Sequence, residues 1–290
     1  MDNGCTNGID TGFVALGYAK VAVLGVVQGI TELMPISSTA HMRIVPALFG
    51  WPDPGSAFSA AMQLAALAAV VSYFWRDVRD LVFGSLSAIV RRDYYDRSFV
   101  LAVGIVIGTI PIGIAGLALA KTLNTCGSPL RGLVVVGLAC LVMSALLAIA
   151  EIAARHQRPF ERVGLLDCLI VGMAQVGALI PGVSRSGSTL TAALFLGFKR
   201  DEAARFSFLL GLPAIALAGL KELAELRHAG LDVHGWAVLA IGLVVASLSA
   251  FVAIWGLLRI LERFSAWPFA IYRAFIGAVL LIGVAIGWLG

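Results

Sequence analysis

Charged residues are scarce in this chain of 290 residues. Lysine, arginine, aspartate and glutamate together make up only 13% of it, whereas 60% of the residues are hydrophobic. A typical soluble domain has roughly 25% charged residues. The mean hydropathy is +0.94. This composition excludes an ordinary soluble domain and predicts an integral membrane protein.

Cysteine is also scarce, and its spacing excludes two kinds of site. Cys5, Cys126, Cys140 and Cys168 form no Cys-x-x-Cys pair and no Cys/His pattern, so neither a zinc site nor a redox motif is supported. We expect Cys140 and Cys168 to fill space in the core or against lipid. The basic residues are not interleaved with aromatic ones, so no nucleic-acid partner is expected. The acidic, polar first twelve residues do not resemble a signal peptide, so we expect the N-terminus to be retained.

Long apolar runs dominate what the chain does contain. Six are long enough to cross a hydrocarbon layer of ~30 Å as helices. They are Ala57–Trp75, Phe99–Leu119, Gly132–Ala150, Phe206–Leu226, Trp236–Leu258 and Phe269–Leu289. Two further runs, residues 18–49 and 165–198, are broken at Pro35 and Pro181, and irregular backbone at membrane depth must be buried in protein or line a wet cavity. The sequence predicts an all-α polytopic membrane protein with six transmembrane helices and two re-entrant helical hairpins.

The distribution of basic residues favours this arrangement. With both hairpins re-entrant, thirteen Lys and Arg residues fall on one side and six on the other, while Arg185 and Arg273 lie within membrane segments. Because cytoplasmic loops are enriched in basic residues, both termini are predicted to be periplasmic. Residues 91–97, "RRDYYDR", are interpreted as a cytoplasmic membrane-surface anchor. Arg273 is expected to extend to the basic side of the membrane, with contact to the polar breaks as the alternative.

The two broken runs resemble each other in sequence. At an offset of 147 residues, Gly25, Gln28, Ser37 and Gly50 match Gly172, Gln175, Ser184 and Gly197; at 148, Asp53, Phe58, Ser59 and Leu64 match Asp201, Phe206, Ser207 and Leu212. Three spans separate the hairpins, so the second enters from the opposite side. We therefore predict one domain, residues 1–290, built from inverted repeats over approximately 13–154 and 160–290, with the two polar tips meeting near the midplane.

The first polar tip brings together a carboxylate, hydroxyls and an imidazole. Gln28 and Glu32 share a helix face that ends at Pro35. Ser38 and His41 are expected to share a face of the short helix that follows. The imidazole could then accept the hydroxyl proton, and the carboxylate could orient the imidazole or hold a divalent cation. The candidate residues of this tip are Gln28, Glu32, Ser37, Ser38, Thr39 and His41.

The second polar tip, "PGVSRSGS", is typical of an anion site. Gly182 and Gly187 allow close backbone approach, Ser184 and Ser186 offer hydroxyl donors, and the planar guanidinium of Arg185 matches phosphate oxygens. The N–H groups that open the next helix add further donors. An unpaired arginine in the membrane centre costs about 2.5 kcal/mol or more, so we interpret Arg185 as functional.

The two tips also carry a family resemblance. "QGITELMPISSTAH" (Gln28–His41) and "PGVSRSGSTLTAALFLG" (Pro181–Gly197), in this order, resemble the motifs of the bacitracin-resistance type of undecaprenyl-diphosphate phosphatase, and the resemblance runs over essentially the whole chain. Relatives commonly have Gly where this chain has Ala40. Gln28 in place of an acid leaves the Glu32 carboxylate as the metal ligand of this motif.

The resemblance implies an activity, partners and a location. The activity is hydrolysis of undecaprenyl diphosphate to undecaprenyl phosphate and inorganic phosphate, which recycles the lipid carrier of peptidoglycan synthesis and underlies bacitracin resistance. The family implies a homodimer in the bilayer of the bacterial inner membrane. It also implies a site that faces the periplasm and uses a divalent cation, Mg²⁺ or Ca²⁺, which we assign to Glu32.

The mechanistic hypothesis divides the candidate residues by role. The predicted catalytic residues are Glu32, Ser38, His41 and Arg185, and the predicted substrate-binding residues are Gln28, Ser37, Thr39, Gly182, Ser184, Ser186 and Gly187. Ser38 is the leading nucleophile or water-orienting group with His41 as its proton partner, and His41 itself or water are the alternatives. A structural ion pair between Glu32 and Arg185 is the simplest rival interpretation. A lipid-phosphate flippase or anion transporter is the rival function, because inverted repeats with broken helices are typical of transporters.

Overall fold

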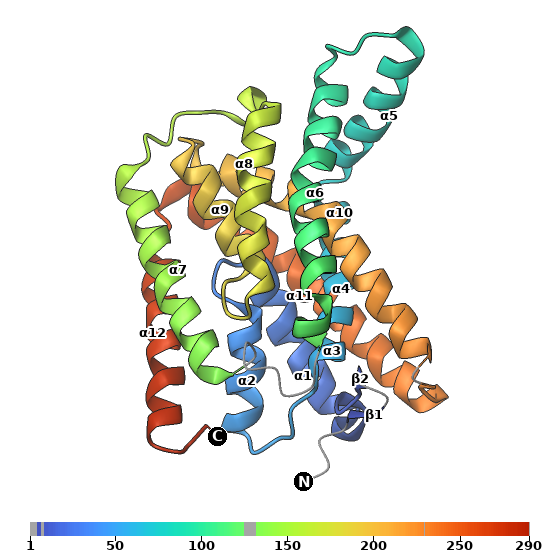
Figure 1. The fold of residues 1–290 in the computed structure, drawn as a ribbon, viewed down its shortest axis with the longest axis vertical. Helices are drawn as coiled ribbons and strands as arrows, with labels where there is room; N and C mark the ends of the chain where they lie inside the picture. The colour runs from blue at the N-terminus through green and yellow to red at the C-terminus, as the bar shows by residue number, and fades with distance from the viewer. Residues whose placement is uncertain (1–4, 7–8, 125–131, 229, 290) are drawn as a thin grey trace.

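The computed structural model describes residues 5–6, 9–124, 132–228 and 230–289, which are mostly helical (Figure 1). Strands β1 (Cys5–Thr6) and β2 (Ile9–Asp10) form a short antiparallel pair. The helices are α1 (Phe13–Leu33), α2 (Ser38–Leu48), α3 (Ser56–Ala61), α4 (Gln63–Tyr73), α5 (Trp75–Arg91), α6 (Arg97–Asn124), α7 (Leu133–Ala153), η2 (Phe160–Arg162), α8 (Leu165–Val176), η3 (Gly177–Leu179), α9 (Arg185–Phe195), α10 (Arg200–His228), α11 (Val233–Arg263) and α12 (Trp267–Ala285).

Some residues used in the cysteine and charge predictions lie outside the part of the chain that the structure describes. Cys126 and Arg131, which entered the cysteine and charge arguments, lie outside the described residues, as do the side chains of Cys5 and Lys121. Cys140 and Cys168 are buried and unpaired, in keeping with the space-filling role predicted for them.

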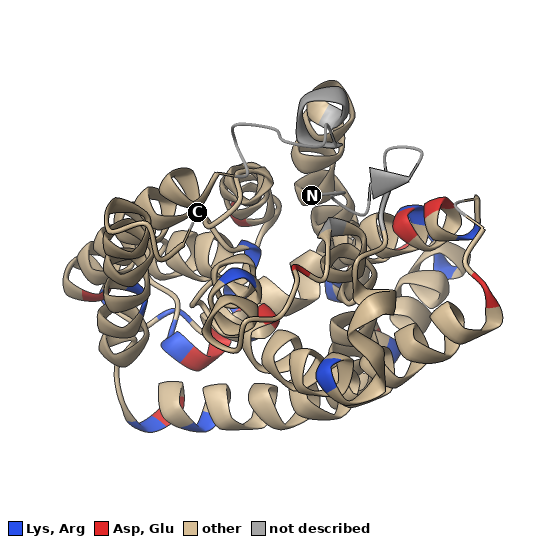
Figure 2. Ribbon diagram, turned by 90° about the horizontal axis from the view of Figure 1, so that it is seen from below, with Lys and Arg blue, Asp and Glu red and all other residues tan. Residues whose placement is uncertain are grey.

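Within the described residues, six helices are long and apolar enough to cross a membrane. They are Phe13–Leu33, Arg97–Leu119, Leu133–Ala153, Arg200–His228, Val233–Arg263 and Trp267–Ala285. The last five contain or overlap predicted spans. The predicted span Ala57–Trp75 instead forms α3 and α4, after which the chain bends by 81° into α5. Figure 2 shows how little charge the helices carry, with blue and red confined to short stretches of tan ribbon. The chain is therefore a multi-pass membrane protein.

Residues 18–49 and 165–198 each contain two α-helices joined at the predicted break. Because α1 is long and apolar enough to cross the membrane by itself, the re-entrant character of the first hairpin stays a prediction. In the first, the Lys20 ammonium lies 5.6 Å from the centre of the Trp51 ring, so the chain enters and leaves at one end of the bundle. In the second, the Gly197 carbonyl accepts hydrogen bonds from the backbone N–H groups of Gln157 and Arg158. Figure 1 shows α1 and α2 approaching from one end and α8 and α9 from the other.

Equivalent positions in the two hairpins adopt the same backbone conformation. Ser37 and Ser184 have φ of 72° and 65°, and each caps the following helix by accepting a hydrogen bond from the N–H three residues on. Gly50 and Gly197, after the second helix of each hairpin, have φ of 61° and 84°. Positive φ is uncommon for serine, so this match supports the predicted repeat locally. The inverted relation between the two halves stays a prediction.

Close helix packing fixes where the two hairpins lie. A Cβ atom at Gly29 of α1 would collide with the Ala246 carbonyl and the Ser249 hydroxyl of α11. A Cβ atom at Gly172 of α8 would collide with the backbone of Gly108 on α6. Small residues are what allow membrane helices to approach this closely. Each hairpin is thus held against a long neighbouring helix, which positions its polar tip.

Candidate active site

The two polar tips meet inside the bundle. Arg185 donates from its guanidinium to Glu32 Oε1 at 2.8 Å, and the two side chains are 13% and 9% exposed. Ser186 Oγ lies 3.1 Å from the carbonyl oxygens of both Glu32 and Met34. The meeting of the tips that the sequence predicts is therefore present in the structure.

Glu32 is the central group of this cluster. Its Oε2 atom accepts hydrogen bonds from Gln28 Nε2 at 2.9 Å and from Ser38 Oγ at 2.7 Å, while Oε1 accepts from Arg185. Three donors from three segments therefore fix the orientation of one buried carboxylate. Because the Ser38 hydroxyl already points its proton at Glu32, the carboxylate is placed to accept that proton when the oxygen attacks an electrophile.

His41 has partners other than the one predicted. Its Nδ1 lies 2.8 Å from the Ser37 carbonyl and its Nε2 lies 2.8 Å from the Tyr272 hydroxyl, and the two rings stack. A carbonyl only accepts, so in the neutral ring Nδ1 carries the proton and Nε2 accepts from Tyr272. The structure thus pairs Ser38 with Glu32 rather than with His41. The sequence did not identify Tyr272 as a candidate site residue, because its position next to Arg273 was the only signal for it.

Arg273 is buried rather than extended toward the basic side, so the first of the two sequence expectations for it is wrong. Its side chain is 0% exposed and donates to the carbonyls of Pro35 at 3.3 Å, Gly182 at 2.6 Å and Val183. These carbonyls lie where the helices are broken and lack intrahelical partners. One guanidinium satisfies carbonyls of both tips because it offers five donors in a planar fork.

The remaining candidates of the second tip serve its backbone. Ser184 Oγ accepts from the Gly187 N–H at 3.2 Å and lies 3.1 Å from Ser186 Oγ. A Cβ atom at Gly187 would collide with the Arg273 guanidinium, and one at Gly182, where φ is 98°, would collide with the backbone of α7. Both glycines therefore make room for neighbouring groups at the tip.

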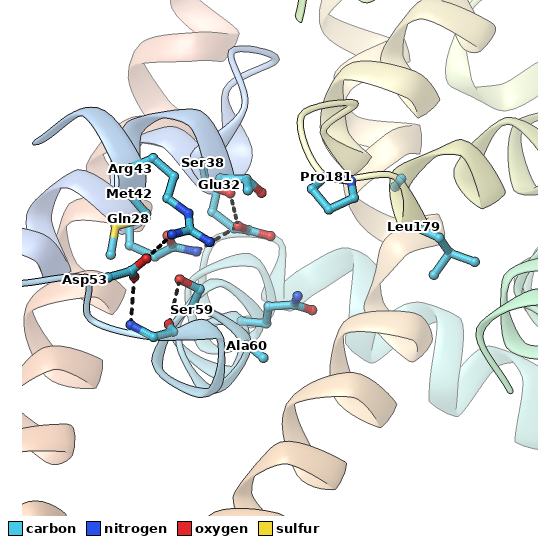
Figure 3. Close-up of a pocket in the computed structure, with 14 residues that line it drawn as sticks. Gln28, Glu32, Ser38, Met42, Arg43, Asp53, Ser59, Ala60, Leu179 and Pro181 are labelled. Carbon is cyan, nitrogen blue, oxygen red and sulfur yellow. Dashed lines mark hydrogen bonds and ion pairs between the residues drawn. The ribbon is translucent and has the colours of Figure 1, made fainter. Parts of the chain in front are cut away.

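A pocket of about 210 Å³ opens beside Glu32 (Figure 3). Figure 3 shows most of its polar side chains on one wall, with Leu179 and Pro181 of the second hairpin across from them. The lining residues are Gln28, Glu32, Ser38, Thr39, Met42, Arg43, Asp53, Gly55, Ser59, Ala60, Gln63, Ala178, Leu179 and Pro181. Predicted candidates Gln28, Glu32, Ser38 and Thr39 are among them. The other predicted candidates do not line the pocket: Ser37, His41, Gly182, Ser184, Arg185, Ser186 and Gly187.

Four polar lining residues were not predicted as site residues: Arg43, Asp53, Ser59 and Gln63. A signal existed for two of them. Arg43 follows Thr39 by four residues and so shares its face of α2. Asp53 begins the turn sequence Asp-Pro-Gly and accepts a hydrogen bond from the Gly55 N–H at 2.9 Å.

The pocket offers limited protein ligands to a metal ion. Among the described residues, no three His, Cys, Asp or Glu side chains gather in a way that could hold one. Two oxygen ligands are available on α1: the Glu32 carboxylate and Gln28 Oε1, which is buried and has no hydrogen-bond partner within the described part of the chain. Mg²⁺ commonly binds through one or two carboxylates and completes its shell with water and substrate phosphates. These residues fit a cation site that the substrate completes.

The fold and the pocket define a multi-pass membrane protein with a polar site enclosed between two opposed, broken helical hairpins. The chain belongs to the family described as bacitracin resistance protein BacA, which it matches over residues 21–279. That range contains both tips, and it confirms the family resemblance predicted from them.

Relatives match along nearly their whole length. The chain is 74% identical over 262 residues to undecaprenyl-diphosphatase 2 of Mesorhizobium japonicum, a match that covers 90% of this chain and 99% of that protein. It is 49% identical over 271 residues to the undecaprenyl-diphosphatase of Synechococcus elongatus, covering 93% and 94%. It is 50% identical over 274 residues to that of Gloeobacter violaceus, covering 94% of each.

Proposed function

We propose that this protein hydrolyses undecaprenyl diphosphate to undecaprenyl phosphate and inorganic phosphate. The observation that carries the proposal is the buried Glu32 carboxylate, which contacts both the Ser38 hydroxyl and the Arg185 guanidinium beside an open pocket. The relatives described above are named as diphosphatases, which does not favour the flippase or transporter alternative. The product returns to peptidoglycan synthesis, and removal of the diphosphate form gives resistance to bacitracin.

The dimensions of the pocket fit a head group rather than a whole lipid. Pockets that enclose a complete drug-sized ligand span roughly 300 to 1,000 Å³, whereas this one is about 210 Å³. The diphosphate enters it while the prenyl chain stays in the membrane. Arg185, which contacts the lining residue Glu32, binds oxygens of the terminal phosphate, as a guanidinium does in other phosphate sites.

The reaction follows from the contact between Ser38 and Glu32. Phosphoryl transfer depends mainly on positioning and on neutralising charge, which Arg185 supplies. As Ser38 Oγ, or a water that it orients, attacks the terminal phosphorus, its proton passes to Glu32. The bond to the bridging oxygen breaks, and its electron pair leaves with undecaprenyl phosphate. If Ser38 attacks, water then hydrolyses the phosphoserine and releases inorganic phosphate.

A divalent cation, Mg²⁺ or Ca²⁺, is part of the proposal. Glu32 and the free Gln28 Oε1 atom would hold it together with substrate oxygens. Bound there, it would neutralise negative charge on the diphosphate. We expect chelator to lower phosphate release and added Mg²⁺ or Ca²⁺ to restore it.

We further propose a homodimer in the bacterial inner membrane, with the pocket and both termini on the periplasmic side. Two observations support the orientation. The start of α1 and the end of α12 lie at the same end of the bundle as α2 in Figure 1. The predicted cytoplasmic loops carry the larger share of the basic residues. The dimer rests on the family resemblance alone.

Phosphate release in detergent tests the activity directly. Hydrolysis needs no second compartment, whereas transport does, so purified wild-type protein should release phosphate from undecaprenyl diphosphate. Glu32→Gln and Arg185→Gln should release far less. The matched control is Glu262→Gln, which alters an exposed carboxylate in the last turn of α11, outside the pocket lining. The proposal fails if the wild type releases none, or if the two site variants match the control.

A further inference from the structure

The pocket is lined by a pair of opposite charges that is more exposed than the pair formed by Arg185 and Glu32. Arg43 of α2 donates from its guanidinium to Asp53 Oδ2, and both side chains line the pocket. They are 38% and 40% exposed, compared with 13% and 9% for Arg185 and Glu32. The pocket is therefore lined by one accessible arginine, Arg43, while the buried Arg185 lies behind the lining and contacts it through Glu32.

We propose that Arg43 binds the second, bridging-side phosphate of the diphosphate and that Asp53 balances the charge of Arg43 until substrate arrives. This inference rests on the proposed function. Arg43 lies five residues after Ser38, which places its Cα about 7.5 Å further along α2 at ~1.5 Å per residue. Arg43 lines the pocket and Arg185 contacts the lining residue Glu32, so one guanidinium is available for each of two phosphate groups joined by a single oxygen.

Arg43 is free to exchange partners at little cost. An exposed ion pair contributes little to stability because water screens it. A diphosphate offers the guanidinium two oxygens in the planar geometry that suits it and more negative charge than one carboxylate. Asp53 Oδ1 remains fixed by the Gly55 N–H at 2.9 Å, so the loop keeps its shape when Arg43 leaves. Asp53 thus balances the charge of Arg43 in the absence of substrate and competes with the diphosphate for it.

The arrangement also separates substrate from product. A diphosphate contacts Arg185 and Arg43 together, whereas undecaprenyl phosphate and inorganic phosphate can each contact only one of them strongly. Arg43 therefore makes the pocket selective for diphosphates and favours release of both products after cleavage.

Two variants with opposite expected effects test this role. Arg43→Gln removes the cation, so we expect KM for farnesyl diphosphate, a short soluble diphosphate, to rise about tenfold with little change in kcat. Asp53→Asn keeps the Oδ1 bond to Gly55 but removes the charge that competes for Arg43, so KM should fall. A purely structural ion pair would be lost in both variants, and both KM values would then move the same way.

Binding measured without turnover separates this inference from the proposed reaction. Calorimetry with methylenediphosphonate and with inorganic phosphate should show a preference for the diphosphonate in the wild type that Arg43→Gln abolishes. Equal weakening of both ligands, or KM changes of one sign in Arg43→Gln and Asp53→Asn, would overturn the role of Arg43. If Arg43→Gln does not fold, a rise or no change in KM for Asp53→Asn is sufficient to reject it. Absence of phosphate release by the wild type would reject the hydrolase itself and leave the binding comparison informative.

Discussion

At the scale of single residues, Glu32 contributes both to the stability of the fold and to the proposed reaction. It is the acceptor for Gln28, Ser38 and Arg185, and its side chain is only 9% exposed. Removing one partner of a buried ion pair leaves the other uncompensated and typically costs about 3 to 5 kcal/mol. Stability and activity must therefore be measured separately at this position.

The first prediction separates them with a double substitution. Glu32→Gln should lower both the unfolding temperature and phosphate release, because Arg185 loses its counter-charge. Adding Arg185→Met should recover much of the stability, since replacing a buried pair by neutral groups is often tolerated. Activity should stay lost because both reactive charges are gone. Thermal unfolding and phosphate release on the same samples check this, and recovery of activity with stability would contradict it.

The second prediction concerns the attacking group. Because Ser38 Oγ bonds Glu32 and both His41 nitrogens have other partners, Ser38 is the better placed nucleophile. Rapid quench of wild-type protein with diphosphate labelled at its terminal phosphate should trap label on Ser38, and Ser38→Ala should abolish trapping and lower kcat by at least about 100-fold. Label on His41 would assign the attack there, and label on neither residue would indicate water.

At the scale of helices, α12 connects the two hairpin tips. Arg273 donates to carbonyls at both breaks, and the neighbouring Tyr272 bonds His41. The tips otherwise meet mainly through Glu32, Arg185 and Ser186. Loss of Arg273 would remove the donor to the Pro35 and Val183 carbonyls and leave Gly182 with only the Cys140 thiol at 3.6 Å. Each unsatisfied group costs about 1 to 3 kcal/mol.

The third prediction follows from that geometry. Arg273→Met should destabilise the protein severely and lower activity with it. Arg273→Lys should recover part of the stability only, because a single ammonium cannot reproduce the planar fork that spans separate carbonyls. Unfolding temperatures of both variants in detergent, compared with Arg263→Met at the exposed end of α11, provide the measurement. Equal stability of the two Arg273 variants would contradict it.

Local sequence signals predicted the breaks in the two hairpins. The contacts of Ser38 and Arg273 could not be predicted, because they depend on residues that are distant in the sequence or on the exact turn of the chain. Pro35, the serines and the glycines mark the breaks because their effects on backbone and capping act within a few residues. The partner of Ser38 depends on how the break turns the chain, since Ser37 adopts a φ of 72°. The burial of Arg273 depends on α12 crossing segments 238 and 91 residues away. No periodicity within one helix encodes either arrangement.

At the scale of the whole molecule, the two hairpins enter from opposite ends and are secured at their bases. Ion pairs between Arg158 and Asp167 and between Arg200 and Glu151 lie near the base of the second hairpin.

Tyr95 is 96% exposed between α5 and α6, and Val233 is 87% exposed at the start of α11. These two positions report on opposite predicted sides of the membrane.

The fourth prediction uses them to test orientation. After the native cysteines are replaced by serine, Val233→Cys should react with a membrane-impermeant maleimide added to intact cells, and Tyr95→Cys should react only after the inner membrane is permeabilised. The charge distribution is the physical reason, because the basic side should be cytoplasmic. The reverse labelling pattern would reject the proposed orientation and move the pocket to the cytoplasmic face.

The position of Arg273 in the chain has a consequence for biosynthesis. The residue that joins both tips belongs to the last helix, so it leaves the ribosome after every other part of the pocket has been translated. Until α12 inserts, the nascent protein holds two polar loops whose carbonyls lack their shared donor. Assembly of the pocket is therefore a late event, and translation that stops before Trp267 yields inserted helices without a finished site.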